Sequence, residues 1–267
     1  MGNDIKAMPV LFVGHGNPMN AIETNNFTEN WHKLGQTLPR PRSILCVSAH
    51  WETQGTRVTS SAQPATIHDF GGFPRELYDV RYPAAGNPEL ARQTIETIKT
   101  TTVLPDEQWG LDHGTWSVIK HVYPRADIPV IQLSLDYYKT PAQHFELAKE
   151  LLRFRQEGVL IVGSGNIVHN LHRVAWDRPH EESYGYDWVI EANEQVKNCI
   201  KSSRFDELIH YQQMGKEVQL AIPTPDHFLP LLYALALKTD ADEVSFFNDK
   251  PVMGSLTMTS VLIGQTN

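Results

Sequence analysis

Cysteine is scarce in this chain, and so are long apolar runs. Only 2 of the 267 residues are cysteines, which excludes a disulfide framework and a cysteine-rich zinc site. No apolar run approaches the roughly 20 residues that span a bilayer. The apolar run at 7–14 is too short for a signal peptide and has no basic leader. We therefore expect a cytoplasmic protein without a membrane partner.

Basic residues are also in the minority. The chain has 23 Lys and Arg residues against 31 Asp and Glu, which gives a net charge of −8. Nucleic-acid binding needs a clustered basic face, so a nucleic-acid partner is excluded. Apolar residues make up 41% of the chain, a globular balance that predicts a single domain over residues 1–267. Either a monomer or a small homo-oligomer is compatible with this composition.

Short β-branched runs alternate with longer helical patterns along the chain. This alternation predicts an α/β domain with a central, mostly parallel or mixed sheet flanked by helices. The expected strands are 10–13, 43–47, 130–133 and 159–162, with 244–247 and 256–262 closing the sheet. The expected helices run from 87–88 to about 100, from 140–141 to about 156, from about 188 to 200, and onward from 227.

The segment from Gln63 to Gly86 is rich in proline and glycine and has no clear periodicity. Long aperiodic segments in compact domains are often functional. We expect this one to border the functional site.

Three histidines come directly after predicted strands. His15 follows the first strand between two glycines, His50 follows the second, and His169 follows the strand that ends near Val162. In open α/β sheets, ligands bind beyond the carboxyl ends of the strands. Flanking glycines let the backbone bend sharply and give a metal ion access to the imidazole. These positions predict a metal site at the carboxyl ends of the strands.

Two further histidines lie where a loop enters a helix. His113 precedes a short helix, and His227 stands at a helix start. The positive end of the helix dipole disfavours imidazolium, and neutral imidazole is the form that binds metal. Both are candidates for the site. The remaining seven are interpreted as surface or core residues, with His68 the first to reconsider: His32, His68, His121, His144, His172, His180 and His210.

Three short patterns resemble known motifs but are incomplete. Gly163-Ser164-Gly165 follows a strand, yet Val168 replaces the third glycine of a dinucleotide-binding loop. Ser164 also lacks the Gly-x-Ser-x-Gly elbow of serine hydrolases, because Val162 stands two residues before it. His180 does not begin a zincin helix, because Tyr184 occupies the second histidine's place. None of these classes is supported.

Five segments together carry a family resemblance. They appear in the order 14–19, 48–52, 112–116, 163–171 and 224–227. On these segments the chain resembles the DODA-type extradiol ring-opening dioxygenases, the bacterial 4,5-DOPA dioxygenase branch of the LigB-like superfamily. The resemblance implies a single α/β domain that uses O₂ to open the ring of a catechol such as 3,4-dihydroxyphenylalanine, giving a muconic semialdehyde.

The resemblance also implies roles for the histidines. It implies His15, His50 and His227 as ligands of one divalent metal, Zn²⁺ or Fe²⁺, and His113 as an acid/base group. His169 has two readings: a fourth ligand or an acid/base. Non-haem Fe²⁺ oxygenases commonly use two histidines and one carboxylate, whereas a set of three histidines also suits Zn²⁺.

Two other functions use the same residues. A zinc-dependent hydrolase or amidase would need a metal-bound water and an acid/base histidine. A non-catalytic binding protein of the same fold would need only the pocket. The titratable His113 and His169 speak against this last reading, because a binding module has no use for them beside a metal.

Overall fold

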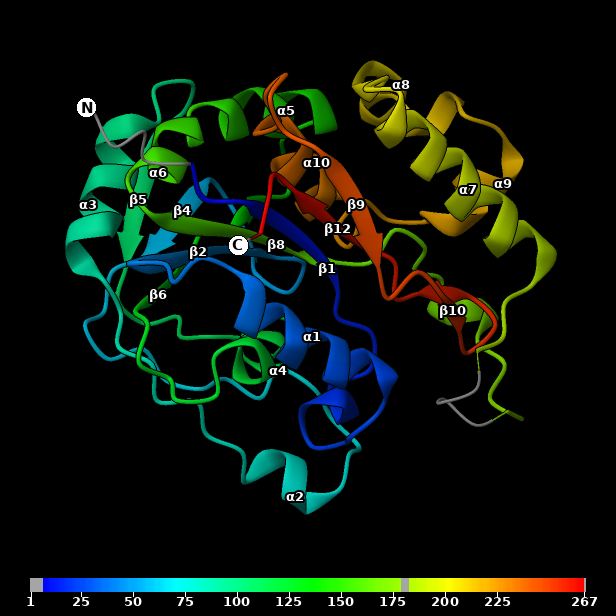
Figure 1. Ribbon diagram of the computed structural model, residues 1–267, viewed down its shortest axis with the longest axis horizontal. Helices are drawn as coiled ribbons and strands as arrows, with labels where there is room; N and C mark the ends of the chain where they lie inside the picture. Colours follow the sequence, from blue (N-terminus) through cyan, green and yellow to red (C-terminus); the bar gives the residue numbers. More distant parts are fainter. Residues whose placement is uncertain (1–6, 179–182, 267) are drawn as a thin grey trace.

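The computed structural model describes residues 7–178 and 183–266, and its centre is a six-stranded sheet (Figure 1). Across the sheet the strands are β6 (Val130–Gln132), β2 (Ser43–Ser48), β8 (Val159–Gly165), β1 (Val10–Gly14), β12 (Ser260–Ile263) and β9 (Val244–Phe247). Strands β6, β2, β8 and β1 pair in parallel, whereas β12 is antiparallel to β1 and β9. The predicted α/β fold with a mostly parallel sheet is confirmed.

Both faces of the sheet are buried, which explains the continuous apolar strands. In β1, Val10 and Phe12 belong to one apolar cluster, while Leu11 and Val13 belong to the other. Successive side chains of a strand point to opposite faces, so a strand with helices on both sides is apolar at every position.

Helices cover the two faces (Figure 1). On one face pack α5 and α10, and on the other α1 and α4. The helix bounds are α1 (Asn26–Thr37), α2 (Arg75–Tyr78), α3 (Pro88–Thr97), α4 (His113–Val122), α5 (Pro141–Lys149), α6 (Leu152–Gln156), α7 (Asp187–Lys201), α8 (Phe205–Ile209), α9 (Lys216–Ala221) and α10 (Leu229–Ala236). No helix within the described ranges is both long and apolar enough to cross a membrane.

Two predicted elements are divided. The expected strand 256–262 splits into β11 (Leu256–Thr257), which pairs with β10 (Pro251–Val252), and β12, which joins the sheet. The chain enters the sheet where the Ser260 hydroxyl accepts a hydrogen bond from the Gly14 amide at 3.0 Å. The expected helix 140–156 ends at α5 and resumes as α6.

Several elements were not predicted. They include α1, whose Asn25 and Thr28 form a reciprocal capping box. They also include two small parallel pairs outside the central sheet: β3 (Glu52–Thr53) with β7 (Leu135–Asp136), and β4 (Thr56–Thr59) with β5 (Val103–Asp106). These strands are short and lack the alternation that reveals a strand in a sequence.

The ends of three central strands lie level. In the register of the sheet, Gly14 pairs with Gly165, and Ser48 pairs with Ser164. The residues that follow β1, β2 and β8 therefore leave the sheet at the same edge. This edge is where the predicted site histidines gather.

Candidate metal centre

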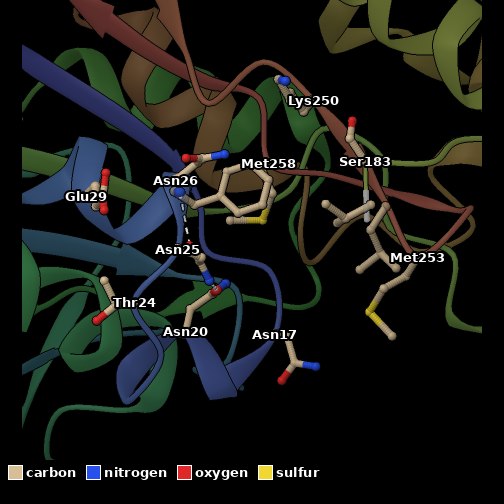
Figure 2. A pocket seen from close by; sticks show the side chains of 13 residues that line it. Asn17, Asn20, Thr24, Asn25, Asn26, Glu29, Ser183, Lys250, Met253 and Met258 are labelled. Carbon is tan, nitrogen blue, oxygen red and sulfur yellow. Dashed lines mark hydrogen bonds between the residues drawn. The ribbon is translucent and has the colours of Figure 1, made fainter. Parts of the chain in front are cut away.

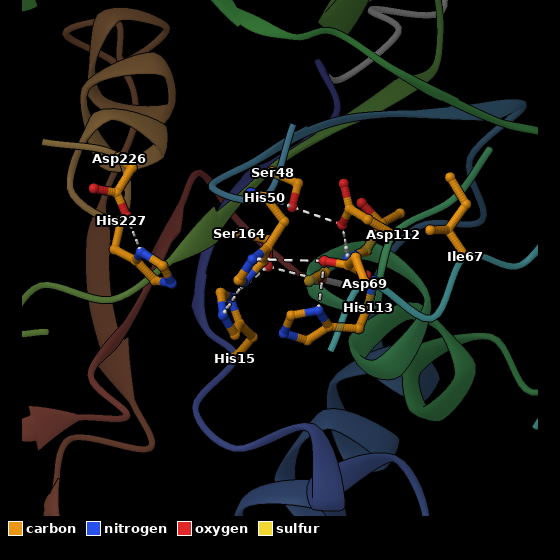
Figure 3. Close-up of polar contacts among 12 residues, drawn as sticks. His15, Ser48, His50, Ile67, Asp69, Asp112, His113, Ser164, Asp226 and His227 are labelled. Carbon is orange, nitrogen blue, oxygen red and sulfur yellow. Dashed lines mark hydrogen bonds and ion pairs between the residues drawn. The ribbon is translucent and has the colours of Figure 1, made fainter. Parts of the chain in front are cut away.

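Three histidines from distant segments converge at this edge. His15 follows β1, His50 follows β2, and His227 precedes α10, and one ring nitrogen from each lies within 4.8 Å of the others. The Nε2 atoms of His15 and His50 are 3.0 Å apart. Figure 3 shows the rings of His15 and His50 turned toward each other, with His227 approaching from the segment before α10.

The position of His227 depends on close backbone packing against β8. A side chain at Gly165 would clash with the His227 carbonyl oxygen, which would lie 2.1 Å from its Cβ. The Asn166 amide donates a hydrogen bond to this same carbonyl at 2.9 Å. Glycine therefore lets the loop before α10 touch the strand, which places His227 opposite His15.

Hydrogen bonds set which nitrogen of His15 and His227 faces the centre. The Ser164 hydroxyl donates to the Gly114 carbonyl at 2.5 Å, so it accepts from Nδ1 of His15 at 3.1 Å. The Asp226 carboxylate accepts a hydrogen bond from Nδ1 of His227. In both rings this leaves the lone pair on Nε2, as is usual for metal-binding histidines held by a second group.

Burial keeps the rings of His15, His50 and His169 neutral. The pKa of His15 and the pKa of His50 lie well below 6.5, mainly because both rings are buried. The positive charge that neighbouring histidines would carry lowers these pKa values further. Burial and His227 likewise lower the pKa of His169 to about 3. Neutral imidazole nitrogens have a lone pair available for a metal ion.

His113 and Asp69 form a second group on the other side of His50. His113 is the first residue of α4, and Asp112 caps this helix by accepting from the Thr115 amide at 3.1 Å. Nδ1 of His113 lies 2.8 Å from the Asp69 carboxylate, and its ring centroid lies 3.9 Å from that of His50. Burial acts to raise the pKa of Asp69, but the hydrogen bonds and charge of His113 outweigh it and lower that pKa.

His169 lies on the opposite side of the centre. Its ring stacks on His227 with centroids 3.5 Å apart and planes inclined by 6°. Its nitrogens group with His227 and Asp226 within 4.8 Å, but not with His15 and His50. All five predicted site histidines are thus brought to one edge of the sheet, with His169 set to one side.

The donor set fits a divalent metal. One ring nitrogen from each of three imidazoles lies within 4.8 Å of the others, and the Nε2 lone pairs of His15 and His50 face each other across 3.0 Å. Without an ion or a proton between them, these lone pairs would repel. Three nitrogen ligands leave coordination positions open, as in catalytic metal sites.

The other histidines have local partners or lie apart. His144 meets the Tyr233 hydroxyl at 2.9 Å, and His121 and His68 meet backbone carbonyl oxygens at 2.8 and 3.1 Å. Among described residues, none of His32, His68, His121, His144, His172 and His210 belongs to a group that could hold a metal. His180 lies outside the described residues.

A cavity of about 370 Å³ is lined by residues near the site in sequence, although none of the described histidines lines it (Figure 2). Its wall includes Asn17, two residues after His15, and Leu256, which pairs with the backbone of His169. Lys250 and Glu29 also line it. The cavity therefore lies beside two of the segments that carry the site.

Three residues of the site were not predicted: Ser164, Asp226 as a histidine partner, and Asp69. The position of Asp226 directly before His227 could have indicated this role. Asp69 lies in the aperiodic segment 63–86, which was expected to border the site, but His68 was the residue singled out there. Ser164 was considered only as part of two incomplete motifs.

Comparison with known proteins shows a family match over most of the chain. Residues 9–262 match the family described as the catalytic LigB subunit of aromatic ring-opening dioxygenase. The chain is 48% identical over 261 residues to 4,5-DOPA dioxygenase extradiol of Escherichia coli K12, covering 96% of this chain and 95% of that protein. It is 34% identical over 242 residues to 4,5-DOPA dioxygenase extradiol of Beta vulgaris, covering 88% of each.

A solved structure is similar as well. An uncharacterized protein of Escherichia coli K12 aligns with a TM-score of 0.84 at 42% identity, over 96% of this chain and all of that one. These matches confirm the expected ring-opening dioxygenase over the hydrolase and the binding protein. The chain belongs to the LigB family of catalytic subunits of aromatic ring-opening dioxygenases.

Proposed function

We propose that this dioxygenase opens the ring of 3,4-dihydroxyphenylalanine, or a close catechol, by extradiol (4,5-) cleavage to a muconic semialdehyde. The names of the relatives from Escherichia coli and Beta vulgaris support this substrate. The observation that carries the proposal is the convergence of three imidazoles at the sheet edge, with a further histidine on each side.

His15, His50 and His227 would hold the metal, and we assign Fe²⁺ as the working ion. Bound Fe²⁺ supplies open coordination positions for the catechol and for O₂, whereas Zn²⁺ has no redox chemistry. Asp226 does not replace a ligand in this assignment, because it already accepts the Nδ1 hydrogen of His227. The site is therefore a set of three histidines rather than two histidines and a carboxylate.

His113 would accept a proton from a catechol hydroxyl. A catechol must lose protons to chelate through both oxygens, and histidine is the natural base near neutral pH. Nδ1 of His113 is already hydrogen-bonded to Asp69, so Nε2 is the nitrogen that can take this proton. His113 is 5% exposed, so its surroundings also exclude water.

We assign His169 the second acid/base role rather than a fourth ligand position. An imidazole nitrogen directs its lone pair in the plane of its ring. The rings of His169 and His227 are nearly parallel and stacked 3.5 Å apart, so their lone pairs do not converge on one point. His169 is thus placed to move a proton beside the ligand His227.

The cavity beside the segments that carry His15 and His169 would hold the amino-acid part of the substrate. Lys250 can pair with the carboxylate of this group, and Glu29 can pair with its ammonium. The apolar side chains of Met258 and Leu256 line the same cavity and can contact the methylene carbon.

The test is oxygen uptake by protein loaded with Fe²⁺ under anaerobic conditions. On mixing with O₂ and 3,4-dihydroxyphenylalanine, one O₂ should be consumed per catechol, and a yellow semialdehyde should appear. Zn²⁺-loaded protein is the matched control and should give background uptake. Background uptake with Fe²⁺ across several catechols, together with cleavage of an ester or amide, would overturn the proposal in favour of a hydrolase.

A further inference from the structure

A single carboxylate, Asp69, contacts both the acid/base His113 and the metal-ligand candidate His50. It lies in the segment between β4 and α2, 44 residues from His113 in the sequence. Backbone hydrogen bonds hold this segment beside the start of α4. The Ile67 amide donates to the Leu111 carbonyl at 2.7 Å, and the Leu111 amide donates to the Ala65 carbonyl at 2.8 Å. The position of Asp69 is therefore built by non-local backbone contacts.

Both oxygens of Asp69 are used by His113. The His113 amide donates to Oδ1 at 2.9 Å, and the ring Nδ1 donates to Oδ2 at 2.8 Å. An ionised carboxylate can only accept, so the hydrogen of the neutral His113 ring lies on Nδ1. Nε2 is left with its lone pair, and Figure 3 shows the ring of His113 turned toward His15.

The same carboxylate lies near His50. Oδ2 of Asp69 is 3.6 Å from Nδ1 of His50, whose Nε2 faces His15. This distance is longer than a hydrogen bond, so the contact is electrostatic and weaker than the two contacts with His113. The side chains of Asp69 and His113 are 15% and 6% exposed, so water screens their contact little.

The other nearby carboxylate has a different role. Asp112 is buried, and its oxygens accept from the Ser48 hydroxyl, the Thr115 amide and the Gln132 side-chain amide. These contacts fix the start of α4 but do not reach the His113 ring. Asp69 is thus the carboxylate that orients this ring.

We propose that Asp69 is a positioning residue for both His113 and His50. It holds His113 as the Nδ1–H tautomer with Nε2 free for the catechol proton, and it supports the orientation of His50. The inference rests on the proposed function for the role of His113. Because the contact with His113 is the stronger one, loss of Asp69 should affect turnover more than metal binding.

The kinetic test compares Asp69→Asn with Asp79→Asn, a surface control directly after α2 whose side chain is 68% exposed. In Fe²⁺-loaded Asp69→Asn, kcat should fall about 10- to 100-fold, as for other groups that orient site histidines. KM for the catechol and the Fe²⁺ affinity, measured by chelator competition, should change less than kcat. Adding Asp69→Asn to His113→Ala should cost little more, because both changes remove the same oriented ring. Turnover near wild type, or full additivity in the double variant, would overturn the proposal.

A second test needs no turnover and is read on the wild-type protein, with one variant used only to assign signals. Long-range nitrogen–proton NMR of the wild-type histidine rings reports which nitrogen carries the hydrogen, and His113→Gln identifies the His113 signals. The proposal predicts the Nδ1–H tautomer for His113. The Nε2–H tautomer would refute the proposal even if catechol cleavage is shown. Conversely, the Nδ1–H tautomer in a protein without catechol turnover would retain the Asp69 contact and reject the proposed function.

Discussion

The two halves of the histidine site are built in different ways. His15 and His227 are held by groups at the sheet edge or next to them in sequence: Ser164 at the end of β8, and Asp226 directly before His227. His113 is held by Asp69, which arrives from a long segment without strands and with one short helix. His50 lies between the two halves and faces His15 with one nitrogen and Asp69 with the other. In the proposed function the sheet half binds the metal, and the loop half supplies the proton acceptor.

The largest expected effect is on the sheet half. His15→Ala removes one of three ligands, so metal affinity should fall by more than the roughly 10- to 100-fold typical of losing a supporting group. Turnover should drop to background. Metal content after dialysis, measured by elemental analysis, checks this. A His15→Ala protein that keeps one metal per chain would contradict the assignment of metal binding to the sheet half.

The next effect separates the loop half from the sheet half. His113→Ala should retain metal but lose about 10²- to 10⁴-fold in kcat, the usual contribution of a general acid or base. The measurement is kcat together with metal content. Loss of metal from this variant would show that His113 is a ligand and that the two halves are not distinct.

A histidine outside both halves separates acid effects on the fold from acid effects on the site. Burial lowers the pKa of His144 from 6.5 to about 4. Between pH 6.5 and pH 4 the unfolded chain therefore binds more protons than the folded chain. The free energy of unfolding should fall as the pH falls through this range, by about 3 kcal/mol at most. His144→Asn should flatten this dependence in urea unfolding of metal-free protein. An unchanged slope would show that other groups cause the acid loss.

A smaller effect on metal affinity is expected when the group that holds His15 is removed. Ser164→Ala removes the hydroxyl that accepts from Nδ1 of His15, so metal affinity should fall about 10- to 100-fold. Chelator competition measures this change, and Asp69→Asn serves as the comparison from the loop half. If Asp69→Asn weakens metal binding more than Ser164→Ala does, the assignment of binding to the sheet half is wrong.

The smallest effect concerns the cavity. Lys250→Met should raise KM for 3,4-dihydroxyphenylalanine up to about fivefold, the value of an exposed ion pair. KM for unsubstituted catechol should stay constant, because that substrate has no carboxylate. Equal changes for both substrates would place the amino-acid group elsewhere.

The sheet half could be predicted from the sequence because its signals are local. Buried strands have continuous apolar runs, and the residues after β1 and β2 lie at a shared edge by the geometry of a parallel sheet, which pointed to His15 and His50. His227 needed the family resemblance, since its place depends on contact between Gly165 and the loop before α10. A glycine in the sequence does not indicate which segment will approach it.

The loop half could be predicted only in part. The segment 63–86 was recognised as a border of the site, but Asp69 was not, because the register between Ile67 and Leu111 depends on backbone contacts across 44 residues. The strands of β3, β4, β5 and β7 are too short for periodicity to reveal them. Helix α1 was missed although its start is capped by Asn25.

The most direct test is a crystal structure of the metal-loaded protein with anomalous scattering to locate the ion. Among the residues that the structure describes, three groups of side chains could hold it: His15, His50 and His227; His50, Asp69 and His113; or His169, Asp226 and His227. The account predicts one ion bound by Nε2 of His15, His50 and His227, with Asp69 still bonded to His113. An ion bound by Asp69 and His113, or by His169 and Asp226, would contradict it.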